Sequence, residues 1–248
     1  MAYRGVGEPA AMERLGLFVL EGRLVVRRAI ESGVRPESLL VTPAALDALA
    51  DLQPEHLPFP VYVATPEALN GVTGFNFHRG CVALARRPAA LPSLDSLLHS
   101  PCLLALEGVG NPDNIGGLFR TASALGAGGV LLDRTSGDPL YRKAVRTSMG
   151  AVLRVPWTRV DGWSEAFDTV RRAGFTIVAL TPSADAMPIE RAPRPGRVVL
   201  LLGAEGPGLL AQTLALADLR VRIPIDPQAD SLNVVVAAGI ALQRLAPA

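Results

Sequence analysis

Residues 102–125, CLLALEGVGNPDNIGGLFRTASAL, join an unbroken apolar run to a glycine-containing polar loop and then to an amphipathic helix. The run at 102–106 has the length and composition of a buried strand. On a helical wheel the stretch 115–125 has one apolar stripe, and Arg120 lies nearly opposite it, away from the core. A buried strand leading through a loop into a helix is the repeating unit of an α/β fold.

The same pattern recurs to the end of the chain. Further apolar runs lie at 129–132, 176–180, 198–202 and 221–225. Continuous apolar runs separated by helical stretches predict a parallel sheet covered on both faces. The final stretch, 232–245, is apolar almost all round, which predicts a buried helix.

The first ninety residues form a separate, smaller α/β pattern. Helices are expected at 23–32, 44–52 and from 66 to 69, and strands at 38–41, 61–63 and 81–85. Two prolines and a polar turn at 86–92 indicate a linker. We therefore predict two domains, residues 1–90 and 91–248.

Composition excludes several classes of protein. With 248 residues, 49% hydrophobic and 19% charged, the chain has ample material for a packed core and is not disordered. It has neither a membrane-spanning run nor an apolar signal core, so a cytoplasmic protein is expected. Cys81 and Cys102 lie far apart among strand-like residues, which favours buried free thiols over a metal site. A net charge of +1 gives little support for a nucleic-acid partner.

Three loops follow predicted strands, where parallel sheets bind their ligands. They span residues 107–120, 201–209 and 223–236. Each has an ordinary interpretation: a helix capped by Asp113 or Asn114, a glycine-rich turn, and a helix capped by Ser231 with Asn233 bonded to a nearby loop. The second loop lacks the lysine and hydroxyl residue of a phosphate-binding loop, and the chain lacks the dinucleotide-binding glycine fingerprint after its first strand.

Taken together, in this order and spacing, the three loops indicate a function far more specifically than any one of them alone. NPDNIGGLFRTA, LLGAEGPGL and IPIDPQADSLNVVVAAGIAL resemble the three motifs of the SpoU/TrmH family of SPOUT RNA 2′-O-ribose methyltransferases. Residues 138–151 also resemble the family, so the likeness covers nearly all of the second part. The first part is similar, more loosely, to the ribosomal-protein-like substrate-binding domain of many members. The one departure is Gly117-Leu118-Phe119, where small and branched residues are common.

The resemblance implies a fold, a cofactor and a partner. The fold would be α/β, with a small N-terminal ribosomal-protein-like domain and a parallel-sheet SPOUT domain that ends in a C-terminal trefoil knot. S-adenosyl-L-methionine (AdoMet) would bind in the knot. Its expected binding residues are Thr181, Gly203, Ala204, Glu205, Ile223, Leu232 and Asn233. Members of the family act as homodimers, with the RNA pocket between the subunits.

The resemblance also implies the catalytic residues. Arg120 would activate the ribose 2′-hydroxyl and hold the phosphate, and whether it takes the proton stays open. Asn114, Glu205, Ser231 and Asn233 would assist it. Arginines and a lysine after the first motif are candidates for phosphate contact, with a solvated helix face as the alternative, and His78 and Arg79 are further candidates. They are Arg134, Arg142, Lys143, Arg146 and Arg154.

The expected reaction is methyl transfer from AdoMet to a ribose 2′-hydroxyl of RNA. Ribosomal RNA is the first choice of substrate, because the additional N-terminal domain is common in that branch, and transfer RNA is the second. The main alternative is an inactive RNA-binding protein with the same fold. RNA binding alone would not require all five of the polar residues expected to act in catalysis, which are Asn114, Arg120, Glu205, Ser231 and Asn233. A Rossmann-type nucleotide enzyme and a small-molecule methyltransferase are the remaining alternatives.

Overall fold

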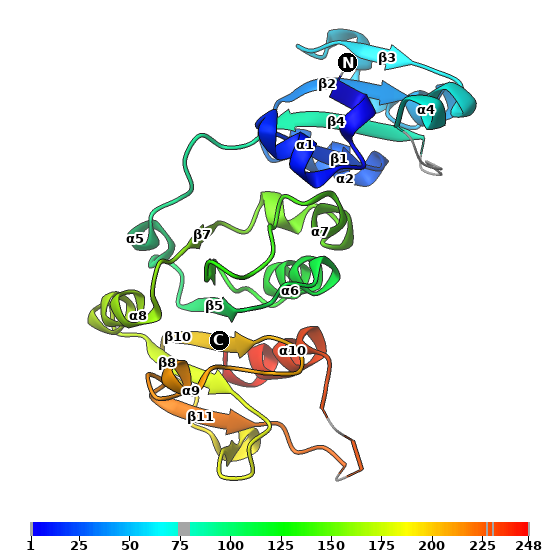
Figure 1. Ribbon diagram of the computed structural model, residues 1–248. Coiled ribbons are helices and arrows are strands. Elements are labelled where there is room, and N and C mark those ends of the chain that lie inside the picture. The colour runs from blue at the N-terminus through cyan, green and yellow to red at the C-terminus, as the bar shows by residue number, and fades with distance from the viewer. Residues whose placement is uncertain (1, 74–79, 227, 230, 248) are drawn as a thin grey trace. The chain divides into compact units, whose positions relative to one another are not determined.

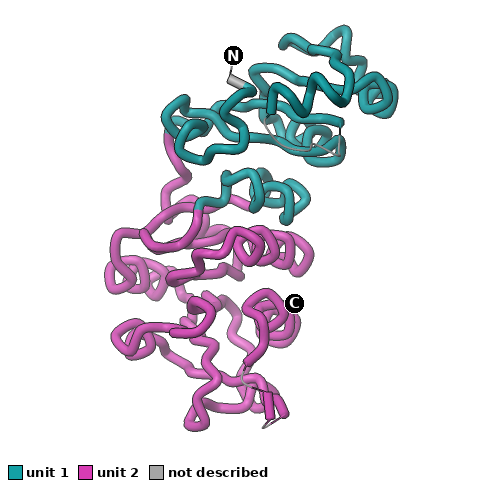
Figure 2. Tube along the Cα trace, turned by 45° about the vertical axis from the view of Figure 1, so that its right-hand side comes forward, with its two compact units in different colours: residues 1–89, 138–154 teal, residues 90–137, 155–248 magenta. Residues whose placement is uncertain are grey.

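A computed structural model describes residues 2–73, 80–226, 228–229 and 231–247, and the predicted RNA contacts His78 and Arg79 lie outside them. The chain separates into two compact units (Figure 2). One contains Met1–Ala89 and Asp138–Arg154, and the other contains Ala90–Gly137 and Val155–Ala248. Residues 138–154 therefore pack with the N-terminal part of the chain, although they lie within the expected second domain.

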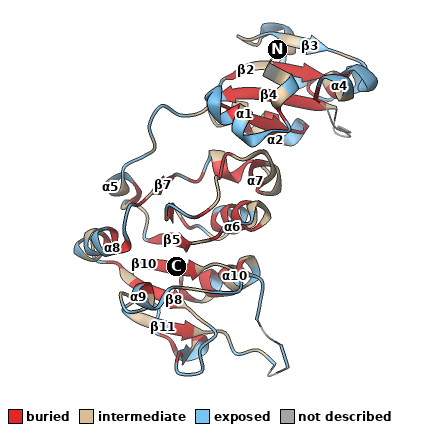
Figure 3. Ribbon diagram, viewed as in Figure 1, coloured by how far each residue is buried: buried red, intermediate tan, exposed pale blue. Residues whose placement is uncertain are grey.

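The second unit is built on a parallel sheet, as the apolar runs predict. In the described residues the sheet has seven strands in the order β7-β6-β5-β10-β8-β11-β9 (Figure 1). The strands are β5 (Cys102–Glu107), β6 (Val130–Leu132), β7 (Trp157–Arg159), β8 (Thr176–Leu180), β9 (Met187–Pro188), β10 (Val198–Gly203) and β11 (Leu219–Arg222). Every residue of β5 is buried, and so are the first five of β10 (Figure 3), which is why these two central strands read as continuous apolar runs.

Helices cover this sheet. They are α5 (Leu94–Leu97), α6 (Pro112–Ala124), α8 (Trp163–Arg172), α9 (Ala211–Leu214) and α10 (Val234–Leu245), with a short 3-10 turn, η5 (Ile189–Arg191). Trp163 and Phe167 of α8 stack on each other and pack with Leu103 and Leu201 of the central strands. The C-terminal helix α10 packs against α6 and β10 with one side buried, whereas Val236 and Ile240 are exposed on it, so the expectation of a helix buried all round is met only in part.

The caps of two helices differ from the predictions. Helix α6 begins at Pro112, and its cap is Asn111, whose side-chain oxygen accepts from the Asp113 amide at 3.0 Å. Helix α10 is capped by Asn233, whose oxygen accepts from the Val235 amide at 2.9 Å. The predicted caps Asp113, Asn114 and Ser231 are therefore wrong. In both helices an asparagine a few residues away makes the side-chain bond that a cap requires.

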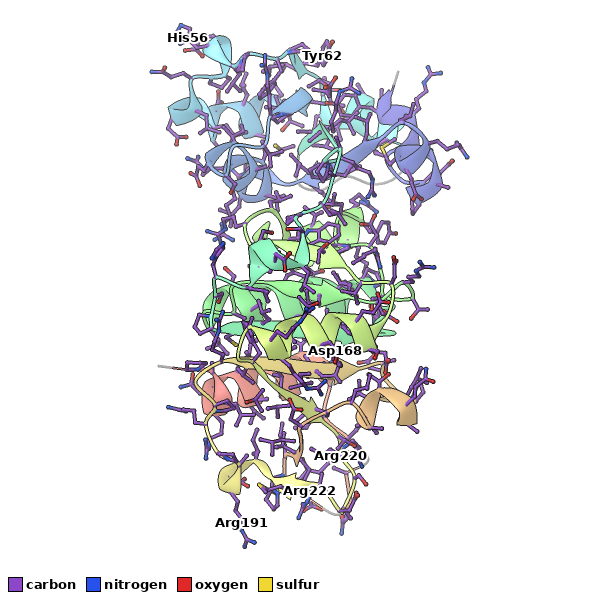
Figure 4. All side chains as sticks on the ribbon, turned by 90° about the vertical axis from the view of Figure 1, so that its left-hand side faces the viewer. His56, Tyr62, Asp168, Arg191, Arg220 and Arg222 are labelled. Carbon is purple, nitrogen blue, oxygen red and sulfur yellow. The ribbon has the colours of Figure 1, made fainter. Side chains whose placement is uncertain are left out.

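The first unit has a sheet of order β1-β4-β2-β3 in the described residues. Its strands are β1 (Leu17–Glu21), β2 (Pro36–Val41), β3 (Val61–Val63) and β4 (Cys81–Arg86). Its helices are α1 (Pro9–Arg14), α2 (Arg23–Glu31), α3 (Pro43–Asp47), α4 (Pro66–Thr73) and α7 (Arg142–Thr147), with 3-10 turns η1 (Ala2–Gly5), η2 (Ala50–Leu52), η3 (Pro54–His56) and η4 (Ala151–Leu153). Strand β3 pairs only with β2 among the described strands, and Tyr62 on this edge strand is exposed (Figure 4).

Two expected elements have different bounds. The helix expected at 44–52 is broken, because α3 stops at Asp47 and residues 50–52 form the separate turn η2. Strand β11 starts at Leu219, before the apolar run, and stops at Arg222. Among the described residues, every helix is too short or too polar to cross a membrane.

Candidate functional site

A cavity of about 610 Å³ opens where β8 and β10 end and the chain leaves β11. Every residue predicted to bind the cofactor lines it, together with Ser231 from the third motif. Apolar side chains form much of the wall, including Leu180, Leu202, Ile223, Ile225 and Leu232. The volume suits a cofactor of nucleoside size, and apolar walls with a few polar groups are typical of such sites.

The glycines of the second motif shape one wall. A Cβ atom at Gly203 would lie 2.4 Å from the backbone carbon of Gly208 and 2.4 Å from the nitrogen of Leu209. The loop is thus folded tightly on itself, and the Gly208 amide donates to the Ala204 carbonyl at 3.0 Å. Gly206 and Gly208 have φ angles of 84° and 70°, which residues other than glycine rarely adopt. Exposed backbone from this loop therefore reaches the cavity.

One polar residue from each of the three motifs joins a hydrogen-bonded cluster, of which Glu205 and Asn233 line the cavity. The Asn233 amide nitrogen donates to Oδ1 of Asn114 at 3.0 Å and to Oε1 of Glu205 at 3.0 Å. These bonds set the orientation of both carboxamides, because the nitrogen of Asn233 is the donor. The amide nitrogen of Asn114 is buried and has no hydrogen-bond partner among the described residues. An unsatisfied buried donor is unusual and is typical of a functional site.

Arg120 and Ser231 lie outside this hydrogen-bonded cluster. Arg120 is exposed on α6, as the helical wheel predicts, and within the described chain no hydrogen bond or ion pair holds its guanidinium. It does not pair with Glu205, which bonds to Asn233. Ser231 is exposed and lines the cavity, just before α10 begins. Both side chains are therefore open to a ligand.

The first motif departs from the family pattern at Gly117, and the packing of α6 against α10 explains why glycine is found there. A Cβ atom there would lie 2.7 Å from Cγ2 of Val235 on α10. Glycine therefore lets the two helices come close, which brings Asn114 at the start of α6 within reach of Asn233 at the start of α10.

Three of the candidate phosphate contacts already have partners in the protein. Arg142 and Arg146 contact the buried carboxylate of Glu21 on β1, at 2.7 and 3.5 Å. Arg134 pairs with Asp161 at 2.9 Å, although its side chain is 70% exposed. RNA contact by these residues, by Lys143 and by Arg154 stays a prediction.

Two carboxylates at strand ends were not identified from the sequence. Glu107 ends β5 and is buried. Asp133 follows β6 and accepts from the Gly108 and Ser136 amides at 3.1 and 2.8 Å. Burial raises the pKa of Asp133, but hydrogen bonds from Ser136, Thr135 and Gly108 outweigh it and hold this pKa below its ordinary value. The signal in the sequence was an acidic residue directly after each apolar run.

The fold and the site define a class: an α/β protein with a parallel sheet, a glycine-lined nucleoside-sized cavity, and an amide and carboxylate cluster with an exposed arginine on a neighbouring helix. The model of the SpoU rRNA Methylase family matches residues 101–243, more than half of the chain. The protein belongs to this family. The family expected from the three loops is therefore confirmed.

Related sequences and solved structures support membership of this family. The chain is 38% identical to an uncharacterized tRNA/rRNA methyltransferase of Mycobacterium bovis, over 91% of this chain and 79% of the relative. It is 33% identical to the 23S rRNA (guanosine-2′-O-)-methyltransferase RlmB of a Burkholderia species, over 72% and 74%. The SpoU methyltransferase AviRb of Streptomyces viridochromogenes, solved with AdoMet, has a TM-score of 0.84 at 26% identity and covers 98% of this chain and 95% of its own.

Proposed function

We propose that this protein transfers a methyl group from AdoMet to a ribose 2′-hydroxyl of RNA, and that its substrate is ribosomal RNA. One observation carries the proposal. Residues of the second and third motifs line a single cavity, and Asn233 joins Asn114 of the first motif to Glu205 of the second. Similarity to RlmB, which is named as a 23S rRNA 2′-O-methyltransferase, supports both the reaction and ribosomal RNA as the substrate.

The residues present fit AdoMet. Gly203 leaves no room for a Cβ atom, so the loop presents backbone donors and acceptors that suit a nucleoside. Ile223 and Leu232 provide apolar surfaces for a base, while Thr181, Ala204, Glu205 and Asn233 provide polar atoms around it. Bound there, AdoMet would supply an electrophilic methyl group, because its positively charged sulfur departs as a neutral thioether. The solved AviRb complex supports this assignment.

Polar residues of the first, second and third motifs are assigned to the RNA. We assign to the exposed guanidinium of Arg120 the binding of a phosphate next to the target ribose and the hydrogen bonding of the 2′-hydroxyl. Its planar guanidinium presents five N–H donors in a fixed fork, which suits contact with both groups. Asn114 and Glu205 are held by Asn233, which orders the polar groups around that hydroxyl, and Ser231 adds a hydroxyl at the cavity.

Further parts of the proposal concern the whole molecule. We propose a homodimer, supported by Val236 and Ile240, which are 52% and 40% exposed one turn apart on α10. We also propose that residues 1–90 form an RNA-recognition domain, that residues 91–248 are the catalytic domain, and that the C-terminal segment forms a trefoil knot. An RNA substrate is consistent with action in the cytoplasm.

The reaction is tested by transfer of labelled methyl groups from AdoMet to ribosomal and transfer RNA, prepared from the source organism with this gene deleted. We expect 2′-O-methylnucleotides in ribosomal RNA. Replacing Arg120 with Ala should lower the rate at least about 100-fold, because it removes the group that polarises the hydroxyl.

Arg172→Ala is the matched control, since Arg172 is also exposed but lies on α8. It should retain the full rate. Labelling confined to transfer RNA would show that transfer RNA, and not ribosomal RNA, is the substrate. Labelling of bases in place of ribose would refute the reaction, and binding of RNA without any AdoMet binding would favour an inactive RNA-binding protein.

A further inference from the structure

Glu107 is a buried carboxylate that has no cationic partner among the described residues. It is the last residue of β5 and is 5% exposed. Its Oε2 accepts from the Leu210 backbone amide at 2.8 Å, and its Oε1 accepts from the Thr213 hydroxyl at 2.5 Å. A buried charge is costly unless hydrogen bonds compensate for it. Its placement therefore calls for an explanation, and both of its bonds go to a single segment more than a hundred residues further along the chain.

That segment continues the loop that lines the cofactor cavity. Residues 203–206 and 208 line the cavity, and the chain then runs through Leu209 to Leu210 and α9. Within the loop, the Gly208 amide bonds to the Ala204 carbonyl. Helix α9 has no side-chain cap of its own. The hydrogen bonds from Leu210 and Thr213 to Glu107 therefore fix the far end of the loop. The loop is thus held at one end by β10 and at the other by this carboxylate.

Glu107 itself does not line the cofactor cavity. It lines a separate cavity of about 530 Å³ with Asp133, Trp163 and Thr213. Any influence on the cofactor must therefore pass through the position of the loop. The hydroxyl of Thr213 is buried along with it, so breaking their bond leaves unsatisfied groups out of solvent.

We propose that Glu107 is a positioning residue for the cofactor: its two hydrogen bonds hold residues 204–209 in the conformation that binds AdoMet. This inference rests on the proposed function. Glutamine can replace most of the contact, because its oxygen accepts from the Leu210 amide while the Thr213 hydroxyl rotates to accept from its nitrogen. Leucine has a similar volume and replaces neither bond.

The test is calorimetric titration of the purified protein with AdoMet, together with steady-state kinetics on RNA. For Glu107→Leu we expect a Kd for AdoMet raised at least about ten-fold, with the KM for RNA unchanged. Glu107→Gln should stay within about three-fold of the wild type, and Thr213→Val, which loses one bond, should fall between the two.

The matched control is Asp218→Leu. Asp218 also accepts a backbone amide, from Ile177 at 2.7 Å, but it lies at the amino ends of β8 and β11, away from the cavity. A wild-type Kd in Glu107→Leu overturns the inference, and so does an equal loss in Asp218→Leu. If Glu107→Leu does not fold, Thr213→Val decides in the same way. Failure of the wild-type protein itself to bind AdoMet would instead refute the proposed function.

Discussion

Gly203 illustrates how a single hydrogen atom in place of a side chain creates a site. Its Cα approaches the backbone of Gly208 and Leu209 so closely that no Cβ fits. Rotation of a side chain cannot relieve such a contact, because the neighbouring atoms are backbone. The loop is therefore compact enough to present its own amides and carbonyls to the cavity, and its shape depends on this residue.

Replacing Gly203 with Ala should raise the Kd for AdoMet at least about ten-fold, because the loop must move away from the cavity wall. Titration calorimetry measures the Kd, and thermal unfolding reports whether the protein is still folded. Gly196→Ala is the control, since Gly196 has open space around it and no positive φ angle. Wild-type affinity in Gly203→Ala would mean that the loop does not contact the cofactor.

At the scale of elements, the contact between α6 and α10 links the first motif to the third. Gly117 faces Val235, and Gly239 on α10 faces Thr121, where a Cβ atom added to the glycine would lie 3.7 Å from Cγ2 of the threonine. A Cβ atom at Gly239 would make ordinary van der Waals contact, so Gly117 is the position at which the close approach requires glycine. The hydrogen bond between Asn114 and Asn233 depends on this spacing.

The substitution Gly117→Ala tests the close approach of α6 and α10, because its effect on the free energy of unfolding should depend on the residue at position 235. In the wild-type background it should lower the free energy of unfolding by about 1 to 2 kcal/mol, because overpacking outweighs the gain in helix propensity. Combined with Val235→Ala, which removes the clashing methyl groups, the same change should be neutral or stabilising by up to about 1 kcal/mol. Urea unfolding of the wild type, the two single variants and the double variant measures both effects. A destabilisation of equal size in both backgrounds would rule out Val235 as the cause.

At the scale of the whole molecule, the chain divides into two units, and each contains one buried cysteine. Cys81 starts β4 in the first unit, and Cys102 starts β5 in the second. Burial raises the pKa of the Cys81 thiol to about 12 and that of Cys102 to about 11. Each thiol therefore reports on the opening of its own unit.

Neither thiol should react with a thiol reagent at pH 8 in the native protein, whereas both should react on unfolding. Variants Cys81→Ala and Cys102→Ala, labelled over a urea series, should give separate midpoints for the two units. Because the folded pKa values are raised, the stability that these thiols contribute is complete below pH 9 and is lost as the pH rises towards 11 to 12. Rapid labelling of either thiol in the native state would contradict their burial.

The sequence by itself determined the features that depend on neighbours along the chain. Apolar runs such as 102–106 and 198–202 predicted buried parallel strands, and the resemblance of the three loop sequences to known motifs indicated the family. The exposed position of Arg120 followed from helical periodicity. The residues predicted to bind the cofactor line one cavity, and their individual roles stay predictions.

Only the tertiary structure decided what depends on residues far apart in the sequence. Glu107 meets Leu210 and Thr213 across more than a hundred residues, and Glu21 meets Arg142 and Arg146, so residues 138–154 pack with the first unit. The identity of the helix caps was also decided there, because neighbouring asparagine, aspartate and serine residues compete for the same amides. Local patterns specify which faces are apolar, whereas the partner of a buried polar group is chosen by the packing of the whole chain.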